Sequence, residues 1–319
     1  MTTIHKEVNK LRTLWTGFRT ARVLLTANNL GILEITKEPS TPEDTSITIK
    51  LNQRAVKILL DALVSMGILK KLQGKYSNTA LTNRLLVKDS PFYQGDILRH
   101  ADTMWQNWSA LDEVVKTGKP ARRKRDWDAF IRGMHNISIL KAKIIIDNLN
   151  LDGIKTVIDI GGGPGTYCIE FAKRGLSATI IDLPETINIA KDVTRGYENI
   201  HYLEGDILLD EIACKYDLVF ISQLFHSYSP DENLLITKKA VNALNQDNPN
   251  AMIVIQEFYI EESMTQPLDS ALFSINMLVQ TENGRCYTVR EMKGWLKQVG
   301  IKKISVIRLP DTILIVGKK

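Results

Sequence analysis

The sequence has few cysteines, no long apolar run and little excess charge. Its three cysteines, Cys168, Cys214 and Cys286, lie far apart and lack the paired spacing of a zinc site or a disulfide framework. This usage fits a reducing, cytoplasmic setting. Apolar runs such as Met252–Ile255 are far shorter than the roughly 20 residues that span a bilayer. The charged segment Met1–Lys10 does not resemble a secretory signal. A secreted or membrane-spanning protein is therefore not expected.

Charge and composition are those of an ordinary globular chain. Lys and Arg number 41 against 36 Asp and Glu, an excess of +5 that does not by itself indicate nucleic-acid binding. The 319 residues predict two domains at about 150 residues each. The basic run Arg122–Arg125 is interpreted as a solvated loop. No metal site is expected, because four of the histidines show no ligand spacing: His5, His100, His135 and His201.

The first third of the chain predicts a winged helix. A helix is expected over Asn52–Gly67, ending at Gly67. Its apolar residues recur at spacings of three and four, which indicates an amphipathic helix. They are Ala55, Ile58, Leu59, Ala62, Leu63 and Met66. The segments Ile68–Leu72 and Tyr76–Leu81 flank a Gln-Gly-Lys turn and predict two strands, so a small wing follows the helix.

After Lys155 the pattern changes to strands that alternate with helices. This alternation predicts an α/β fold, with a parallel, doubly wound sheet covered on both faces. The expected strands are Thr156–Ile160, Ala178–Ile181, His201–Leu203, Asp217–Ile221, Met252–Gln256, Ile304–Leu309 and Thr312–Val316. The short link Leu309–Asp311 predicts a hairpin, so the last strand is expected to run antiparallel.

A glycine-rich loop gives the sharpest functional signal. It follows the strand Thr156–Ile160 and opens a helix, with glycines at 161, 163 and 165. Glycine allows positive φ and lets a ligand approach bare backbone. The G-x-G-x-G spacing differs from the G-x-G-x-x-G of dinucleotide sites. Asp159, just before the loop, favours a ligand with a cationic amine over a diphosphate.

Two further carboxylates end neighbouring strands. Asp182 lies 21 residues after Gly161, where a carboxylate accepts hydrogen bonds from ribose hydroxyls. Asp206 ends the third strand and is placed to accept from an exocyclic adenine amine. Taken alone, an aspartate at either position is also what a simple helix cap would show. Together they predict one nucleoside crevice at the carboxyl edge of the sheet.

These motifs resemble a known family. Asp159–Gly165, Asp182–Pro184, Gly205–Asp206 and Leu224–His226 look like S-adenosylmethionine-dependent O-methyltransferases of the plant caffeate and acetylserotonin type, a pattern shared by bacterial and fungal natural-product enzymes. Leu51–Leu86 resembles the winged-helix dimerisation domain of that family. The resemblance covers nearly the whole chain.

The resemblance implies a class I methyltransferase fold with a Rossmann-like sheet and a mainly helical N-terminal domain. It implies a dimerisation domain at 1–98, linking helices at 99–149 that roof the acceptor pocket, and a cofactor-binding domain at 150–319. It also implies S-adenosyl-L-methionine as cofactor, S-adenosyl-L-homocysteine as product, a small-molecule acceptor and a homodimer formed through the N-terminal domain. The expected cofactor-binding residues are Asp159, Gly161, Gly163, Gly165, Asp182, Leu183, Asp206, Ile207 and Ser222.

The resemblance also assigns catalytic residues. His226 matches the family's general base, and Glu257 matches a carboxylate that orients it. A phenol of pKa about 10 needs a base at neutral pH, and an imidazole near 6.5 suits that task when a carboxylate fixes its tautomer. The acceptor, expected to be aromatic or polyketide-like, would contact residues in two segments. They are Met134, His135, Met277, Gln280 and Thr281.

Two departures leave alternatives open. Cys286 stands where the family carries a second orienting Glu, and Ser227-Tyr228 replaces Asp-Trp after the base. A more acidic nucleophile could then react largely by proximity. The alternatives are methylation of N, S or C, or a reaction that binds the sulfonium without transferring its methyl. Cys286 itself is interpreted as a pocket wall rather than a reactive thiol.

A DNA-binding regulator is the remaining alternative, because a winged helix can enter the major groove. The candidate recognition helix carries Gln53, Arg54 and Lys57, but Asp61 interrupts this face. A DNA reader needs a clear basic face. The sequence therefore favours dimerisation, with neither a nucleic-acid nor a membrane partner.

Overall fold

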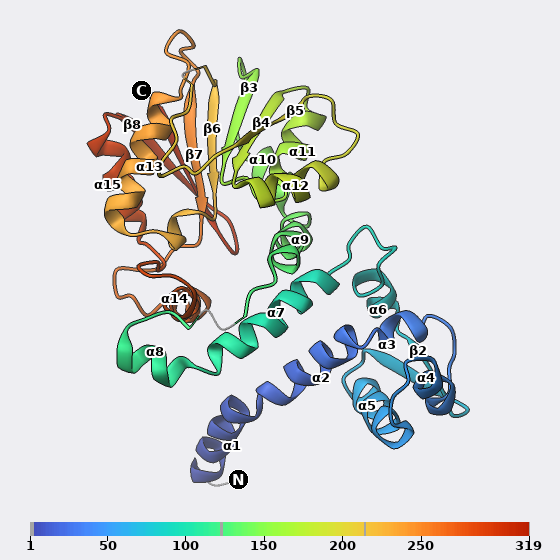
Figure 1. The fold of residues 1–319 in the computed structure, drawn as a ribbon. Coiled ribbons are helices and arrows are strands. Elements are labelled where there is room, and N and C mark those ends of the chain that lie inside the picture. The colour runs from blue at the N-terminus through green and yellow to red at the C-terminus, as the bar shows by residue number, and fades with distance from the viewer. Residues whose placement is uncertain (1–2, 122–123, 214, 319) are drawn as a thin grey trace. The chain divides into compact units, whose positions relative to one another are not determined.

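The computed structural model describes residues 3–121, 124–213 and 215–318 (Figure 1). The chain divides into two compact units between Asp102 and Thr103. Each unit buries its own apolar core. The division falls within helix α7 (Gly95–Trp108). A separate linking segment over 99–149 stays a prediction.

The first unit is mainly helical and contains one short hairpin. Its elements are α1 (Thr3–Thr16), α2 (Phe18–Asn29), α3 (Ile32–Ile35), α4 (Pro42–Thr48), α5 (Gln53–Ser65), β1 (Leu69–Leu72), β2 (Lys75–Asn78), α6 (Ala80–Leu85) and the start of α7. Asn52 caps α5 by accepting from the Ala55 N–H (3.0 Å), and Gly67 follows the helix with φ +73°. The antiparallel pair β1–β2 is the predicted wing.

The second strand of the wing is shorter than the sequence predicts. It ends at Asn78, and Ala80 and Leu81 begin α6 instead of continuing the strand. The reason is a local cap. The Thr79 side chain accepts a hydrogen bond from the Thr82 N–H and so starts a helix.

The buried residues of α5 agree only in part with the predicted apolar stripe, which shares Leu63 with them. Val56, Leu60 and Leu63 are buried, whereas Ile58 is 54% exposed and Ala55 is exposed. The helix carries apolar residues on two faces, so periodicity alone could not identify the buried one.

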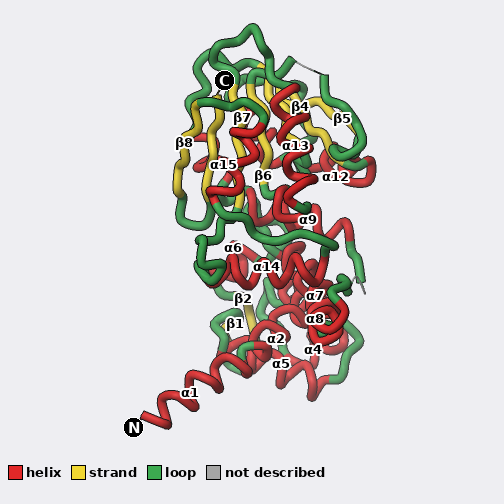
Figure 2. Tube along the Cα trace, turned by 90° about the vertical axis from the view of Figure 1, so that its left-hand side faces the viewer, coloured by secondary structure: helices red, strands yellow, loops and turns green. Residues whose placement is uncertain are grey.

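The second unit contains a seven-stranded sheet in the order β5-β4-β3-β6-β7-β9-β8, drawn in yellow in Figure 2. Every pairing is parallel except those of β9, which runs antiparallel to β7 and β8, so the prediction for the last strand is confirmed. The strands are β3 (Thr156–Ile160), β4 (Ser177–Asp182), β5 (Ile200–Glu204), β6 (Leu218–Ser222), β7 (Met252–Glu257), β8 (Lys303–Arg308) and β9 (Ile313–Lys318).

Helices cover both faces of this sheet (Figure 1). One face packs on α13 (Pro230–Asn242) and α15 (Val289–Gln298). The other packs on α10 (Ala142–Asp147), α11 (Thr166–Lys173) and α12 (Pro184–Val193). The remaining helices of the unit are α8 (Leu111–Thr117), α9 (Trp127–Ser138), η1 (Phe225–Ser227) and α14 (Leu268–Gln280).

The strand order reverses between β3 and β6, which lie side by side at the centre of the sheet. In open α/β sheets, ligands bind outside the carboxyl ends of the strands at such a switch point. The glycine loop, Asp182, His226 and Glu257 all follow or end strands at this edge.

Within the described ranges, no helix is long and apolar enough to cross a membrane, and no cluster of His, Cys, Asp and Glu could hold a metal ion. Lys124 and Arg125 of the predicted basic loop are exposed. Arg122 and Arg123 lie outside the described residues, as does Cys214. The other two cysteines are free thiols.

Candidate active site

The glycine loop joins β3 to α11 through left-handed backbone. Gly161, Gly163 and Gly165 have φ of +66°, +54° and +76°. A Cβ on Gly165 would lie 2.5 Å from Ile180 Cδ1, so glycine allows the helix to pack against β4. A Cβ on Gly163 would meet no protein atom within 4 Å. The loop therefore leaves open space beside its middle glycine.

Asp182 binds this loop. One carboxylate oxygen accepts from the Gly163 N–H (2.9 Å) and the other from the Leu183 N–H (2.7 Å). Burial raises the pKa of Asp182. The Asp182 carbonyl also accepts from the Gly205 N–H (3.0 Å), which ties the ends of β4 and β5 together. The loop and the two predicted acidic positions thus form one backbone framework.

Asp206 follows β5 at the same edge of the sheet. Its Oδ1 accepts from the Leu208 N–H (2.9 Å), and Ile207 between them is buried. Burial, followed by the charges of Asp206 and Asp182, raises the pKa of Tyr228 to about 12. Both carboxylates therefore act electrostatically on the Tyr228 phenol, although sequence reasoning treated Tyr228 only as a departure from the family pattern.

Asp159 lies beneath the loop and is fully buried. Its Oδ2 contacts the Cys168 thiol (3.8 Å), and among the described residues its Oδ1 has no hydrogen-bond partner. Burial, followed by the charge of Asp182, raises the pKa of Asp159 to about 8. A buried carboxyl with an unpaired oxygen is a group that a positively charged ligand would stabilise.

Ser222 is part of a buried polar network. Its hydroxyl donates to Gln256 Oε1, which also accepts from the Tyr167 hydroxyl (3.4 Å). Gln256 Nε2 donates to Thr312 Oγ1, and that hydroxyl donates to the Glu257 carbonyl (2.9 Å). The network fixes the end of β7 next to Glu257. Sequence reasoning missed it, because Gln256 ends an apolar run without a motif.

His226 and Glu257 are in direct contact. His226 Nδ1 lies 2.9 Å from Glu257 Oε1, and the His226 backbone N–H donates to Oε2 (3.3 Å). The Phe258 N–H also donates to Oε1 (2.8 Å). The exposed fractions are 8% for His226 and 1% for Glu257. A carboxylate on Nδ1 selects the tautomer in which Nε2 carries the free lone pair.

Two phenylalanines that sequence reasoning missed pack around the histidine. The Phe273 ring meets His226 edge to face, with centroids 4.8 Å apart, and the Phe258 ring lies 6.1 Å from His226 and 4.8 Å from Phe273. Phe273 lies one helical turn before Met277 on α14. Its place beside a predicted pocket residue was the available signal.

Cys286 lies in the segment that packs against the histidine. A Cβ on Gly284 would be 2.3 Å from the His226 carbonyl oxygen, so this segment is close to the backbone of η1. Cys286 is fully buried, and its N–H donates to Ser274 Oγ (3.2 Å). Burial raises the pKa of Cys286 to about 11, so the side chain is an un-ionised thiol at neutral pH.

The residues predicted for the acceptor pocket come from α9 and α14. Met134 is half-buried, and His135 Nδ1 lies 2.9 Å from Thr166 Oγ1 at the start of α11. This contact joins α9 to the helix that follows the glycine loop. Burial lowers the pKa of His135.

Hydrogen bonds hold the predicted pocket residues at the end of α14. Met277 is buried, and Gln280 Oε1 accepts from Asn107 Nδ2 (3.2 Å) on α7. Thr281 Oγ1 donates to the Met277 carbonyl and accepts from the Gly284 N–H (2.9 Å). Through Gly284, these residues connect to the backbone of His226.

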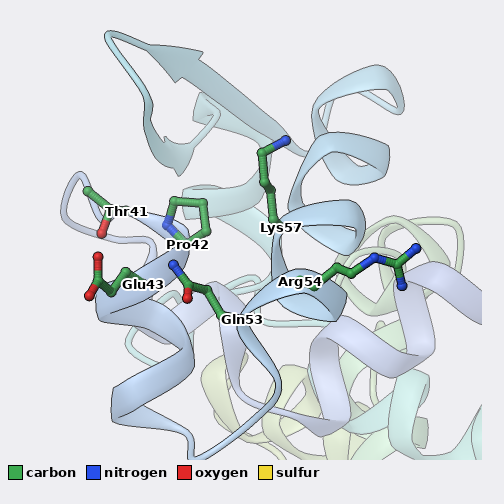
Figure 3. Close-up of a pocket in the computed structure, with 6 residues that line it drawn as sticks. All are labelled: Thr41, Pro42, Glu43, Gln53, Arg54 and Lys57. Atoms are coloured by element: carbon green, nitrogen blue, oxygen red, sulfur yellow. The ribbon is translucent and has the colours of Figure 1, made fainter.

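The face considered for DNA binding lies in the first unit. Gln53, Arg54 and Lys57 border a hollow together with Thr41, Pro42 and Glu43, as Figure 3 shows. Arg54 extends away from Glu43 in this view. Lys57 pairs with Asp61 (3.0 Å). Acidic groups therefore interleave with the basic ones on this face.

Comparison with known proteins agrees with these features. An O-methyltransferase domain family matches residues 114–302, and an O-methyltransferase dimerisation domain family matches residues 13–88. A 3-hydroxy-5-methyl-1-naphthoate 3-O-methyltransferase of Streptomyces sahachiroi is 28% identical, over 93% of this chain and 90% of its own. The S-adenosyl-L-methionine-dependent methyl transferase PigF of a Serratia strain is 26% identical, over 95% and 93%.

A solved structure gives the same fold. Human N-acetylserotonin methyltransferase in complex with S-adenosylmethionine aligns with a TM-score of 0.88 and 23% identity, covering 100% of this chain and 98% of that one. The fold class and the resemblance read from the sequence are confirmed. The chain belongs to the S-adenosylmethionine-dependent O-methyltransferase family.

Proposed function

We propose that this protein transfers a methyl group from S-adenosylmethionine to a hydroxyl of a small aromatic acceptor. The relatives support an aromatic acceptor, since one is named for a hydroxynaphthoate and another for acetylserotonin. The observation that carries the proposal is the His226–Glu257 contact at the carboxyl edge of the sheet, close to the glycine loop.

The residues of the crevice fit the cofactor. Asp182 and Asp206 offer carboxylates to ribose hydroxyls and to an adenine amine, with Leu183, Ile207 and Ser222 beside them. Gly161, Gly163 and Gly165 expose the backbone, and the unpaired oxygen of Asp159 suits a cation. When bound, the cofactor supplies an electrophilic methyl group on a sulfonium.

His226 is proposed as the general base. Glu257 accepts from Nδ1, and Nε2 takes the proton of the acceptor hydroxyl as the oxygen becomes nucleophilic. Three donors converge on the Glu257 carboxylate, namely His226 Nδ1, the His226 N–H and the Phe258 N–H, and they hold it in place. Cys286 contributes a neutral pocket wall and no second charge.

The acceptor is proposed to lie between α9 and α14. Phe258 and Phe273 would hold an aromatic ring next to the base and exclude water. Met134 and Met277 would add adaptable apolar walls to the same pocket. His135, Gln280 and Thr281 are proposed as the polar groups of this pocket.

A homodimer is proposed through the N-terminal region, residues 1–98. Helix α1 has no buried residue in the isolated chain, and its apolar side chains are exposed. They are Ile4, Val8, Leu11, Leu14 and Trp15. Such a stripe is typical of a surface that a partner covers. Other expectations from the sequence stay predictions. They are the linking role of 99–149, the cofactor domain at 150–319, a cytoplasmic location and the absence of nucleic-acid or membrane partners.

The proposal is tested by incubating the protein with methyl-labelled S-adenosylmethionine and a panel of hydroxylated aromatic compounds. Mass spectrometry should find a labelled methyl ether together with one S-adenosylhomocysteine per product. Product formation without S-adenosylhomocysteine would instead identify a non-methylating reaction. Label on nitrogen, sulfur or carbon would contradict the hydroxyl acceptor.

A further inference from the structure

Lys141 lies in the short turn between α9 and α10, at the carboxyl edge of the sheet. Its N–H donates to the Ser138 carbonyl (3.0 Å), and its own carbonyl accepts from the Ile145 N–H (2.9 Å). The backbone of this lysine is therefore fixed at the start of α10. The side chain is half-buried.

The ammonium of Lys141 lies over the ring of the residue that follows Glu257. Lys141 Nζ lies 5.8 Å from the centroid of the Phe258 ring. Phe258 directly follows Glu257, and its ring is in the cluster that contains His226 and Phe273. An acceptor ring held by this cluster would lie within reach of both the imidazole and the ammonium.

Among the described residues, no carboxylate oxygen lies within 4.0 Å of Lys141 Nζ. The two carboxylates that act on it, those of Asp311 and Glu257, do so at longer range. Glu257 is engaged with His226 and Phe258, and Asp311 is exposed in the β8–β9 turn. Burial lowers the pKa of Lys141, which reflects incomplete compensation of its charge.

Two other lysines show how hydrogen bonds and ion pairs stabilise ammonium groups elsewhere in this chain. The buried Lys239 donates to the Leu208 and Asp210 carbonyls (3.0 and 2.8 Å). Lys143, two residues after Lys141, is exposed and pairs with Asp147. Lys141 has neither arrangement, and a half-buried ammonium of this kind is stabilised by an anionic ligand.

We infer that Lys141 binds a carboxylate of the acceptor, so that the acceptor class is the hydroxyaryl carboxylic acids. The hydroxyl would face His226 while the carboxylate pairs with Lys141, and the aromatic ring between them would contact Phe258. This inference rests on the proposed function, since the hydroxyl is the group that is methylated there. It assigns Lys141 to acceptor specificity and gives it no part in the proton transfer.

The test compares the binding of 3-hydroxy-1-naphthoate and its neutral carboxamide, with S-adenosylhomocysteine present to prevent turnover. Calorimetry on the unmodified protein should show the acid binding about 10- to 100-fold more tightly, the range expected for a charged hydrogen-bonded pair. Lys141→Met should remove this preference and leave amide binding unchanged. Lys141→Arg should restore most of it. Lys143→Met is the matched control, with the same charge loss at an exposed site.

Equal loss of acid and amide binding in Lys141→Met would show a structural role and overturn the inference, as would an unmodified protein without preference for the acid. If neither probe binds, the proposed acceptor class is wrong. Methyl transfer to the acid is measured separately. Failure to form an ether while Lys141→Met still abolishes the acid preference would contradict the proposed function and leave the role of Lys141 standing.

Discussion

The crevice proposed for the cofactor is made largely of backbone, whereas the acceptor side is made of side chains from separate segments. On the cofactor side, Asp182 holds the Gly163 amide, and the glycine loop and Asp182 come from one continuous stretch of β3, α11 and β4. Asp206 and Ser222 follow from the ends of the next two strands, β5 and β6. On the acceptor side, His226, Glu257, Phe273 and Lys141 come from four different segments. Backbone geometry restricts what such a crevice binds, but side chains can be exchanged without disturbing the fold. This difference explains how one fold can keep a cofactor while its acceptor varies.

The largest effect expected on the cofactor side comes from Asp182→Ala. It removes the acceptor for the Gly163 and Leu183 amides and the proposed ribose contact, so affinity for S-adenosylmethionine should fall by about 1–3 kcal/mol, or about 5- to 150-fold. Calorimetry measures this change. Glu185→Ala is the control, because it removes an exposed carboxylate one turn further along. Equal affinities in both variants would contradict the ribose role.

Gly163→Ala should have a smaller effect. An alanine at φ +54° costs about 1–2 kcal/mol of stability wherever it lies, and its methyl group would enter the open space of the crevice. Gly175→Ala provides the matched strain at φ +81° away from the crevice. Both variants should lose similar stability, but only Gly163→Ala should lose cofactor affinity, by roughly tenfold. Equal affinities would show that no ligand occupies that space.

Asp159→Asn should have little effect on stability at acid pH and a distinct effect that grows as the pH rises. The pKa of Asp159 is raised from 3.8 to about 8. Between these two pH values the folded protein therefore holds a proton that the unfolded chain has already lost. The carboxyl therefore lowers stability as pH rises through this window. The variant should be more stable than the parent at pH 9 and equal to it near pH 4. In thermal unfolding, the midpoint temperature of the variant should rise by roughly 2–4 °C for each kcal/mol of stability gained.

The Asp159 carboxyl also predicts that cofactor binding releases a proton. A cation bound near Asp159 would lower its pKa, so binding of S-adenosylmethionine near pH 7 should release up to one proton. Calorimetry in two buffers with different ionisation enthalpies counts these protons. The release should be absent in Asp159→Asn. An identical count in parent and variant would remove Asp159 from the cofactor site.

The difference between the two sides also governs what the sequence could predict. The glycine loop and Asp182 were found because a strand, a turn and a helix follow one another in a short motif. The predicted end of the second wing strand, Leu81, was wrong, because the Thr79 cap starts a helix there. The predicted apolar stripe of α5 was only partly right, because the helix carries a second apolar face.

The acceptor side was only partly predictable. His226 and Glu257 were found through the family resemblance. Phe273 and Lys141 were not, because their importance comes from packing between separate segments of the chain. Phe273 packs on His226, and Lys141 lies beside Phe258. No local pattern marks a lysine whose partner is a ligand.

The most direct test of the account is the methyl-transfer rate of His226→Ala in a single turnover with labelled S-adenosylmethionine and the best acceptor of the panel. The rate should fall about 10²- to 10⁴-fold while cofactor affinity stays unchanged. His201→Ala, which removes an exposed histidine on β5, should behave like the parent. A His226→Ala enzyme that forms the ether at the parental rate would contradict the assignment of His226 as the base.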